Sequence, residues 1–278
     1  MHRSTQRILS THVGSLARPP DLLDLMGEKE HGRPYDADGF AKRVTAAVAD
    51  VVAAQVRAGL DVVTDGEMGK VSFLTYVKDR LTGFDASAGE RLMPPSWQVE
   101  IDAFPDYYAG YLGKYKDQVS PMTTMVCTGP ITYDGHEQLR TDIDNLRAAL
   151  DGHAVTEAFL PSTSPSGFGR NEHYGSHGEY LAAVAEALRE EYLAIVEAGF
   201  LLQIDDPWLI EYISENPAIA DTIVLYAGIV GRENVIAGAD CGFSSRASYH
   251  PEVHPTVVWE KFRALAEGAR LASRHLWP

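Results

Sequence analysis

The apolar positions of the chain repeat in one order: a long amphipathic stretch, then a glycine, then a short apolar stretch. Residues 40–58 carry valines at helical spacing, Gly59 follows, and residues 60–64 (Leu-Asp-Val-Val-Thr) are mostly apolar. The same order recurs at residues 179–204 and 218–237. Glycine suits the left-handed position after a helix, and short apolar strands suit a parallel sheet covered on both faces. The pattern therefore predicts an α/β fold of repeated strand–helix units.

Six core strands are expected, and one long stretch does not fit the repeat. The strands begin near residues 8, 60, 122, 156, 200 and 234, and a last helix is expected at residues 255–272. Prolines and aromatic residues break the pattern near 85–121, where we expect an inserted excursion with a hairpin around residues 98–103. A closed (β/α)₈ barrel needs eight strands in about 250 residues. An open α/β sheet accepts six, and periodicity does not choose between the two.

Charge and cysteine content exclude several classes of protein. The chain has 278 residues with 24 Lys and Arg against 39 Asp and Glu, a net charge of −15. This argues against a nucleic-acid partner, which needs a basic face, and against an electrostatic membrane anchor. Two cysteines make no disulfide framework. No apolar stretch is long enough to span a membrane, and no secretory signal follows the first residues, so we expect a cytoplasmic protein.

Polar residues follow the expected strands, where parallel α/β folds place their active sites. The segments that follow five of the strands are residues 11–15, 64–67, 128–130, 205–208 and 239–243. Asp65, Glu67 and Asp205 are among them. Carboxylates gathered at one mouth repel one another unless a metal ion, another cation or an ammonium-bearing substrate sits there. The strand ends therefore indicate a binding site for such a group.

Each feature also has a purely structural interpretation. Asp205 and Asp206, ahead of Pro207, could cap the next helix. Cys127 lies inside an apolar strand and is predicted to be a core residue, whereas Cys241, past a strand end, favours a functional role. Two histidine pairs have i, i+4 spacing but are interrupted by glycine or proline, so we interpret them as loop residues: His173 with His177, and His250 with His254.

Four of these segments together resemble a known family. They are Ile-Leu-Ser-Thr-His-Val-Gly-Ser-Leu-Ala-Arg-Pro at 8–19, Asp-Val-Val-Thr-Asp-Gly-Glu at 61–67, Leu-Gln-Ile-Asp-Asp-Pro at 202–207 and Asp-Cys-Gly-Phe at 240–243. In this order they are similar to the motifs of cobalamin-independent methionine synthases, especially the short single-barrel members. Gly129-Pro130 matches a weaker motif. The resemblance runs from residue 8 to about 275 and implies a TIM-type (β/α) barrel in a single domain, residues 1–278.

The resemblance also implies an activity and its partners. Members of the family transfer a methyl group from a methylated folate-type donor to a thiol such as homocysteine, in methionine biosynthesis. A zinc ion holds the thiol and lowers its pKa, as zinc does for bound water. The residues that match family positions for substrate are Val13, Gly14, Ser15, Glu67, Asp205 and Glu211, and the one that matches a zinc ligand is Cys241. The first three would hold the amino-acid carboxylate, the next two its ammonium or thiol end, and Glu211 the folate.

One segment departs from the family pattern. Only 32 residues lie between Pro207 and Asp240, without His or Cys, although the family takes its other zinc ligands from this part of the chain. An internal deletion near residues 216–222 would explain this and would leave about six of the eight barrel strands. Zinc needs at least three protein ligands, and substitutes for the missing ones would have to come from His12, Glu67, Asp205 or the loop at residues 173–177. The activity would then be impaired.

Two other functions stay open. One is a non-catalytic remnant that binds an amino acid or thiol, and the other is a barrel lyase or hydrolase that depends on a divalent cation. An incomplete barrel exposes two sheet edges. A new pairing between the strands near 200 and 234 would cover them, and so would a homo-oligomer.

Overall fold

The computed structural model places strands at all six expected positions. It describes residues 2, 7, 9–87, 101–106, 108–109, 119–120, 124–165, 169–205, 236–238, 247–250, 255–256, 258–259, 262–263 and 266. The strands are β1 (Leu9–Thr11), β2 (Val62–Thr64), β3 (Phe84–Ser87), β4 (Thr124–Cys127), β5 (Glu157–Thr163), β6 (Arg170–Asn171), β7 (Leu201–Asp205) and β8 (Ile236–Gly238). The helices are α1 (Pro20–Glu30), α2 (Ala37–Ala58), α5 (His136–Ala149) and α6 (His177–Glu197), with a 3₁₀ helix at Thr75–Asp79.

Local sequence signals set the ends of the two longest helices. The Asp36 side chain accepts the Gly39 N–H at the start of α2, and Gly59, with φ of 90°, ends it. Ser176 caps α6 in the same way through the Glu179 N–H. Both helices were expected from periodicity. Helices α1 and α5 were not, because charged residues dilute the apolar positions of these shorter segments.

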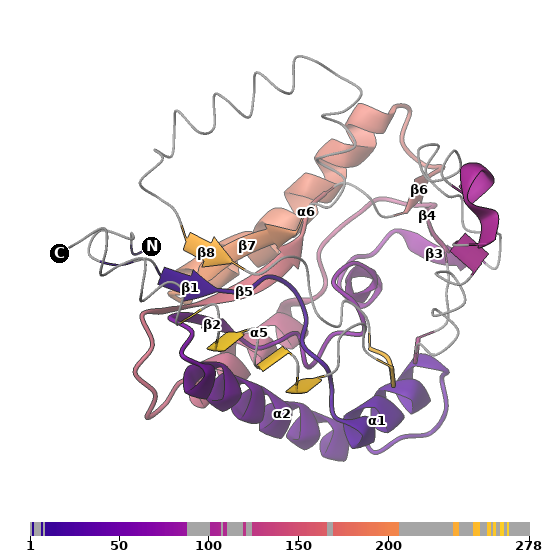
Figure 1. Cartoon of the computed structure of the whole chain (residues 1–278). Coiled ribbons are helices and arrows are strands. Elements are labelled where there is room, and N and C mark those ends of the chain that lie inside the picture. The colour runs from indigo at the N-terminus through magenta and orange to yellow at the C-terminus, as the bar shows by residue number, and fades with distance from the viewer. Residues whose placement is uncertain are drawn as a thin grey trace.

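The parallel strands lie side by side in an order that differs from chain order (Figure 1). Strand β1 is parallel to β8, and β5 is parallel to both β2 and β7. The Asp61 N–H donates to the Ser10 carbonyl at 3.0 Å and the Thr11 hydroxyl to the Val62 carbonyl at 3.0 Å, which holds β1 beside β2. These pairings confirm an α/β fold with a parallel sheet. Closure of that sheet into a barrel is not among the pairings of the described strands.

Strand β4, the third expected strand, does not lie between β2 and β5. It pairs antiparallel with β3 and parallel with β6, at the right of Figure 1. The expected excursion supplies β3, and residues 101–103 are helical where a hairpin was predicted. The hairpin prediction was therefore wrong for residues 101–103, because a short alternation of apolar and polar residues does not distinguish a strand from a helical turn, and residues 98–100 lie outside the described residues.

Helices α2, α5 and α6 cover one face of the parallel strands. Helix α2 packs on β2 and α5, and α6 packs on α5, β5 and β7. Side chains alternate along β5, so that Ala158 and Leu160 enter the core under these helices, while Phe159 points to the opposite face. No helix in the described part of the chain combines the length and the apolar character that a membrane crossing requires.

Candidate functional site

A buried hydrogen bond joins the ends of β1 and β2. After β1 the chain turns back over β2, and the Leu16 N–H donates to the Gly66 carbonyl at 3.1 Å. The Ser15 hydroxyl donates to Glu67 Oε2 at 2.8 Å, and both side chains are buried. The structure thus brings together two of the residues that the sequence proposed for substrate binding.

Glu67 is held in an uncommon backbone conformation. Its φ is 56°, in the left-handed region, and it follows Gly66, whose φ is 63°. The Glu67 N–H donates to Asp65 Oδ1 at 3.0 Å, which helps to hold this turn. Left-handed conformations cost energy for residues other than glycine and cluster at functional sites. The turn aims the Glu67 carboxylate inward, where Oε1 has no hydrogen-bond partner among the described residues although the side chain is fully buried.

Two buried cations lie beside this turn. The Arg18 guanidinium donates to the carbonyls of Glu67 and Lys70 at 2.9 and 2.7 Å, and lies 4.0 Å from Glu67 Oε2. Lys70 Nζ donates to the Pro161 carbonyl at 2.6 Å. Pro161 lies in β5, two residues after Phe159, which is the last residue of that strand to pair with β2. The charges of Arg18 and Lys70 offset part of the negative charge of the acidic side chains.

Asp205 brings the end of β7 to the same region. It is the register partner of Thr163 at the end of β5, and its carbonyl accepts the Ser164 N–H at 2.9 Å. Burial raises the pKa of Asp205, while Gln203 and Lys70 oppose that rise. The Asp205 charge also contributes to raising the pKa of Glu67, so the two carboxylates lie within electrostatic range.

Burial raises the pKa of all three carboxyl groups at these strand ends. The pKa of Asp65 rises to about 6, with Lys70 acting against the rise. The pKa of Glu67 rises for the same reason, opposed by Lys70 and Arg18. The three acids, Asp65, Glu67 and Asp205, therefore outnumber the two nearby cations, Arg18 and Lys70. A bound cation or ammonium group would stabilise the ionised form of these acids.

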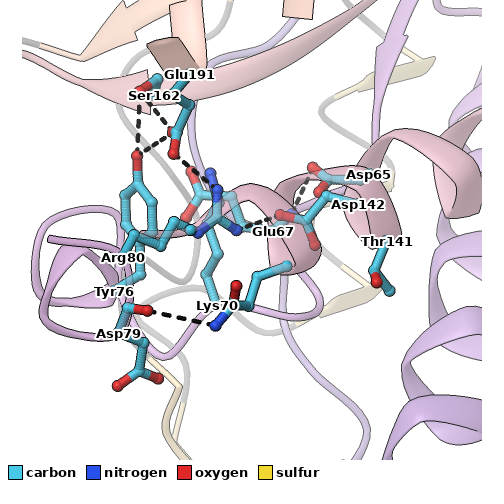
Figure 2. A network of polar contacts seen from close by, with 12 residues as sticks. Asp65, Glu67, Lys70, Tyr76, Asp79, Arg80, Thr141, Asp142, Ser162 and Glu191 are labelled. Atoms are coloured by element: carbon cyan, nitrogen blue, oxygen red, sulfur yellow. Dashed lines mark hydrogen bonds and ion pairs between the residues drawn. The ribbon is translucent and has the colours of Figure 1, made fainter. Parts of the chain in front are cut away.

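A second buried network lies next to the strand-end acids and centres on Glu191 of α6 (Figure 2). The Glu191 carboxylate on α6 accepts hydrogen bonds from Tyr76, Ser162, Tyr133 and Arg80 at 2.6, 2.7, 2.8 and 2.9 Å. Arg80 also pairs with Asp142. Lys70 Nζ lies 4.3 Å from the centre of the Tyr76 ring, which links this network to the site.

Sequence analysis did not identify Arg18, Lys70 or Glu191. A signal existed for Glu191, because it lies on the apolar stripe of its helix, three residues after Leu188 and four before Ile195. A carboxylate on a buried stripe needs a partner. Arg18 lies within the motif at residues 8–19, but no local pattern indicates that it or Lys70 is buried, because only the fold brings their carbonyl partners near.

His12 lies among aromatic rings rather than in a ligand cluster. Its Nε2 is 3.0 Å from Gln55 Oε1, and its ring centre is 4.9 Å from that of Phe262 and 6.3 Å from that of Phe159. Burial lowers the pKa of His12 to about 4, so the imidazole is neutral near pH 7. Its role as a metal ligand stays a prediction.

The described residues do not form a metal site. Within that part of the chain, no three His, Cys, Asp or Glu side chains are grouped closely enough to hold a metal ion. The predicted zinc ligand Cys241, the predicted folate contact Glu211, and the proposed deletion near residues 216–222 lie outside the described residues. Zinc binding therefore stays a prediction.

The remaining predicted residues have mixed outcomes. Val13 is exposed and Gly14 has a φ of 73°, and both lie in the segment between the end of β1 and Ser15. Cys127 is buried, as expected for a core residue. His177 is the first residue of α6, so its assignment to a loop was wrong. Residues 128–130 follow β4, which pairs with β3 and β6 rather than with the strands that carry the site.

Comparisons with known proteins agree with this fold. No model of a known protein family matches the chain. It is 27% identical over 205 residues to the 5-methyltetrahydropteroyltriglutamate–homocysteine methyltransferase of Streptomyces avermitilis, covering 73% of this chain and 23% of that protein. It is 24% identical over 221 residues to the methionine synthase of Pyrococcus furiosus, covering 78% and 57%. The chain thus spans less than a quarter of the first relative and just over half of the second.

Two solved structures share the fold. One is a B12-independent methionine synthase from Shewanella sp. W3-18-1 in complex with selenomethionine, with a TM-score of 0.52 and 19% identity, covering 92% of this chain and 65% of that one. The other is a putative vitamin-B12 independent methionine synthase from Listeria monocytogenes, with a TM-score of 0.56 and 15% identity, covering 98% and 99%. At these identities the comparison concerns the fold.

Proposed function

We propose, since this chain is a relative of the cobalamin-independent methionine synthases, that it transfers a methyl group from a methylated folate-type donor to an amino-acid thiol such as homocysteine. Two kinds of observation support the proposal. The curated relatives carry this activity in their names, and the end of the parallel sheet holds a buried acidic site where parallel α/β folds bind their ligands.

The buried Ser15–Glu67 pair carries the proposal. Glu67 is fully buried, is fixed in a strained turn, and keeps one carboxylate oxygen without a partner. The ammonium group of an amino acid would supply the missing donor and would lie between Glu67 and Asp205. The backbone of Val13 and Gly14 would then hold the substrate carboxylate beside Ser15. This orients the thiol away from the acidic residues, toward the methyl donor, which Glu211 would contact.

The strand order supports the proposed barrel and the proposed oligomer. Among the described strands, β1 pairs with β8, β5 pairs with β2 and β7, and two hydrogen bonds join β1 to β2, an order consistent with a TIM-type barrel that lacks strands. A homo-oligomer would cover the edges that such a barrel exposes.

Zinc has no complete set of ligands among the described residues. In the proposed function it would supply an activated thiolate, with Cys241 as one ligand and His12 as a candidate second. The residues that the structure describes contain no group of side chains that could hold the metal. The lack of His and Cys between Pro207 and Asp240 favours the second candidate, a remnant that binds an amino acid or thiol without turnover.

Calorimetry and a turnover assay together test the proposal. Homocysteine should bind the wild-type chain, and Glu67→Gln should weaken binding about tenfold or more, because a hydrogen bond to a charged group contributes about 1.5–3 kcal/mol. Glu190→Gln, an exposed change on α6, is the matched control and should bind like wild type. Methionine formed from homocysteine and methylated folate with added zinc identifies a methyltransferase.

Binding that survives a chelator, without turnover under any condition, would identify the remnant. A wild-type chain that binds no homocysteine, or a Glu67→Gln variant that binds it unchanged, would refute both.

A further inference from the structure

We propose that Thr163 is a specificity-determining residue of this site, whose hydroxyl accepts the third N–H of a substrate ammonium group held by Glu67 and Asp205. The site would then select thiols that carry a primary amine. This inference rests on the proposed function.

The register of the sheet places Thr163 beside Asp205. The two residues are partners in the pairing of β5 with β7, and partners in parallel strands project their side chains from the same face. The neighbouring Ser162 hydroxyl donates to Glu191 on α6, on the helix-covered face. Because side chains alternate along β5, the Thr163 side chain points to the face opposite the helices, at the strand end where Asp205 lies.

The Thr163 hydroxyl is buried and unused. Its N–H donates to the Tyr76 hydroxyl at 3.3 Å and its carbonyl accepts the Tyr192 hydroxyl at 2.6 Å, so the backbone is satisfied on both sides. The residue is 1% exposed, yet Oγ1 has no hydrogen-bond partner among the described residues. Buried polar groups without partners are rare, and each calls for an explanation such as a ligand.

The chemistry of the three groups matches a primary ammonium. Such a group has three N–H donors, and Glu67, Asp205 and Thr163 offer two carboxylates and a hydroxyl oxygen as acceptors. A substrate carboxylate is a poorer fit at this point, because Glu67 and Asp205 would repel it. A substrate whose nitrogen is acylated or missing would leave at least one of these acceptors unpaired.

The experiment compares two variants and two ligands. Thr163→Val removes the hydroxyl with little change of shape, and Thr163→Ser keeps it. Calorimetry is run with homocysteine and with its deaminated analogue, 4-mercaptobutyrate. We expect Thr163→Val to weaken homocysteine binding about tenfold and to leave binding of the analogue unchanged. Thr163→Ser should bind homocysteine within about threefold of wild type, since it keeps the acceptor.

Thermal unfolding separates this role from a structural one. Valine replaces an unpaired buried hydroxyl with a methyl group, so the melting temperature of Thr163→Val should equal or exceed that of wild type. Unchanged homocysteine binding by Thr163→Val would overturn the inference, and so would an equal loss for both ligands. A wild-type chain that binds no homocysteine would instead refute the proposed function itself, which makes the two failures distinguishable.

Discussion

Replacing Glu191 by Gln should reveal how much the buried network behind the site contributes to stability. Burial alone would raise the pKa of Glu191, but Arg80, Lys70 and the Tyr76 hydroxyl lower it to about 2 from an ordinary value of 4.5. At about 1.4 kcal/mol per pKa unit, the ionised carboxylate contributes roughly 3–4 kcal/mol to the free energy of unfolding. Because the folded pKa is lowered, this contribution is present above about pH 4.5 and is lost as the pH falls toward 2.

The Gln variant keeps the shape of the side chain but loses the charge. Its amide oxygen still accepts hydrogen bonds from the hydroxyls, whereas its NH₂ group opposes the other donors. Among the described residues, Arg80 then keeps Asp142 as its one acidic partner. Breaking a buried ion pair by removing one partner costs about 3–5 kcal/mol. We expect a loss of this size for Glu191→Gln in urea unfolding at about pH 7, followed by circular dichroism.

The neighbouring residue provides the control. Glu190 pairs with His136 at 2.8 Å on the exposed side of the same helix, and exposed pairs contribute little. Glu190→Gln should therefore change the free energy of unfolding by less than about 0.5 kcal/mol. If Glu191→Gln lies within about 1 kcal/mol of Glu190→Gln, the network does not stabilise the fold as argued.

Three further substitutions test other parts of the structure. Burial raises the pKa of Asp65 to about 6, so the folded chain binds more protons than the unfolded chain between about pH 4 and 6 and stability falls as the pH rises. Asp65→Asn should flatten that fall in urea midpoints measured across this range, and an unchanged slope would contradict the burial argument. Gln55→Leu leaves the buried N–H and carbonyl of Thr64 without the amide that pairs both at 3.0 and 2.7 Å, so guanidinium unfolding should show a loss of about 2–4 kcal/mol. A loss below about 1 kcal/mol would mean that water or a neighbour replaces the amide. Gly66→Ala places a Cβ in a left-handed residue, 3.1 Å from Met68 Cε, and should cost about 1–2 kcal/mol and lower the melting temperature by several degrees. An unchanged melting temperature would show that the turn relaxes freely.

Much of the fold could be read from local patterns alone. Helical spacing and a closing glycine predict α2 and α6, and short apolar stretches predict the six strands. These features depend on residues within a few positions of one another, which is why periodicity reports them. The rule that parallel strands end at a common edge then placed Ser15, Glu67 and Asp205 in one region.

Only the tertiary structure decided which strands are neighbours. Strand β4 leaves the parallel sheet and β2 pairs directly with β5, so residues 128–130 do not share the edge that carries the site. Buried hydrogen bonds also join residues that are far apart in the sequence. Lys70 bonds to Pro161, Glu191 to Ser162 and Thr163 to Tyr192, and the two partners in each bond are at least 29 residues apart. Such contacts depend on how helices and strands pack against one another. Packing decides whether a buried charge or hydroxyl finds a partner, and therefore what its burial costs in free energy, whereas its neighbours in the sequence do not.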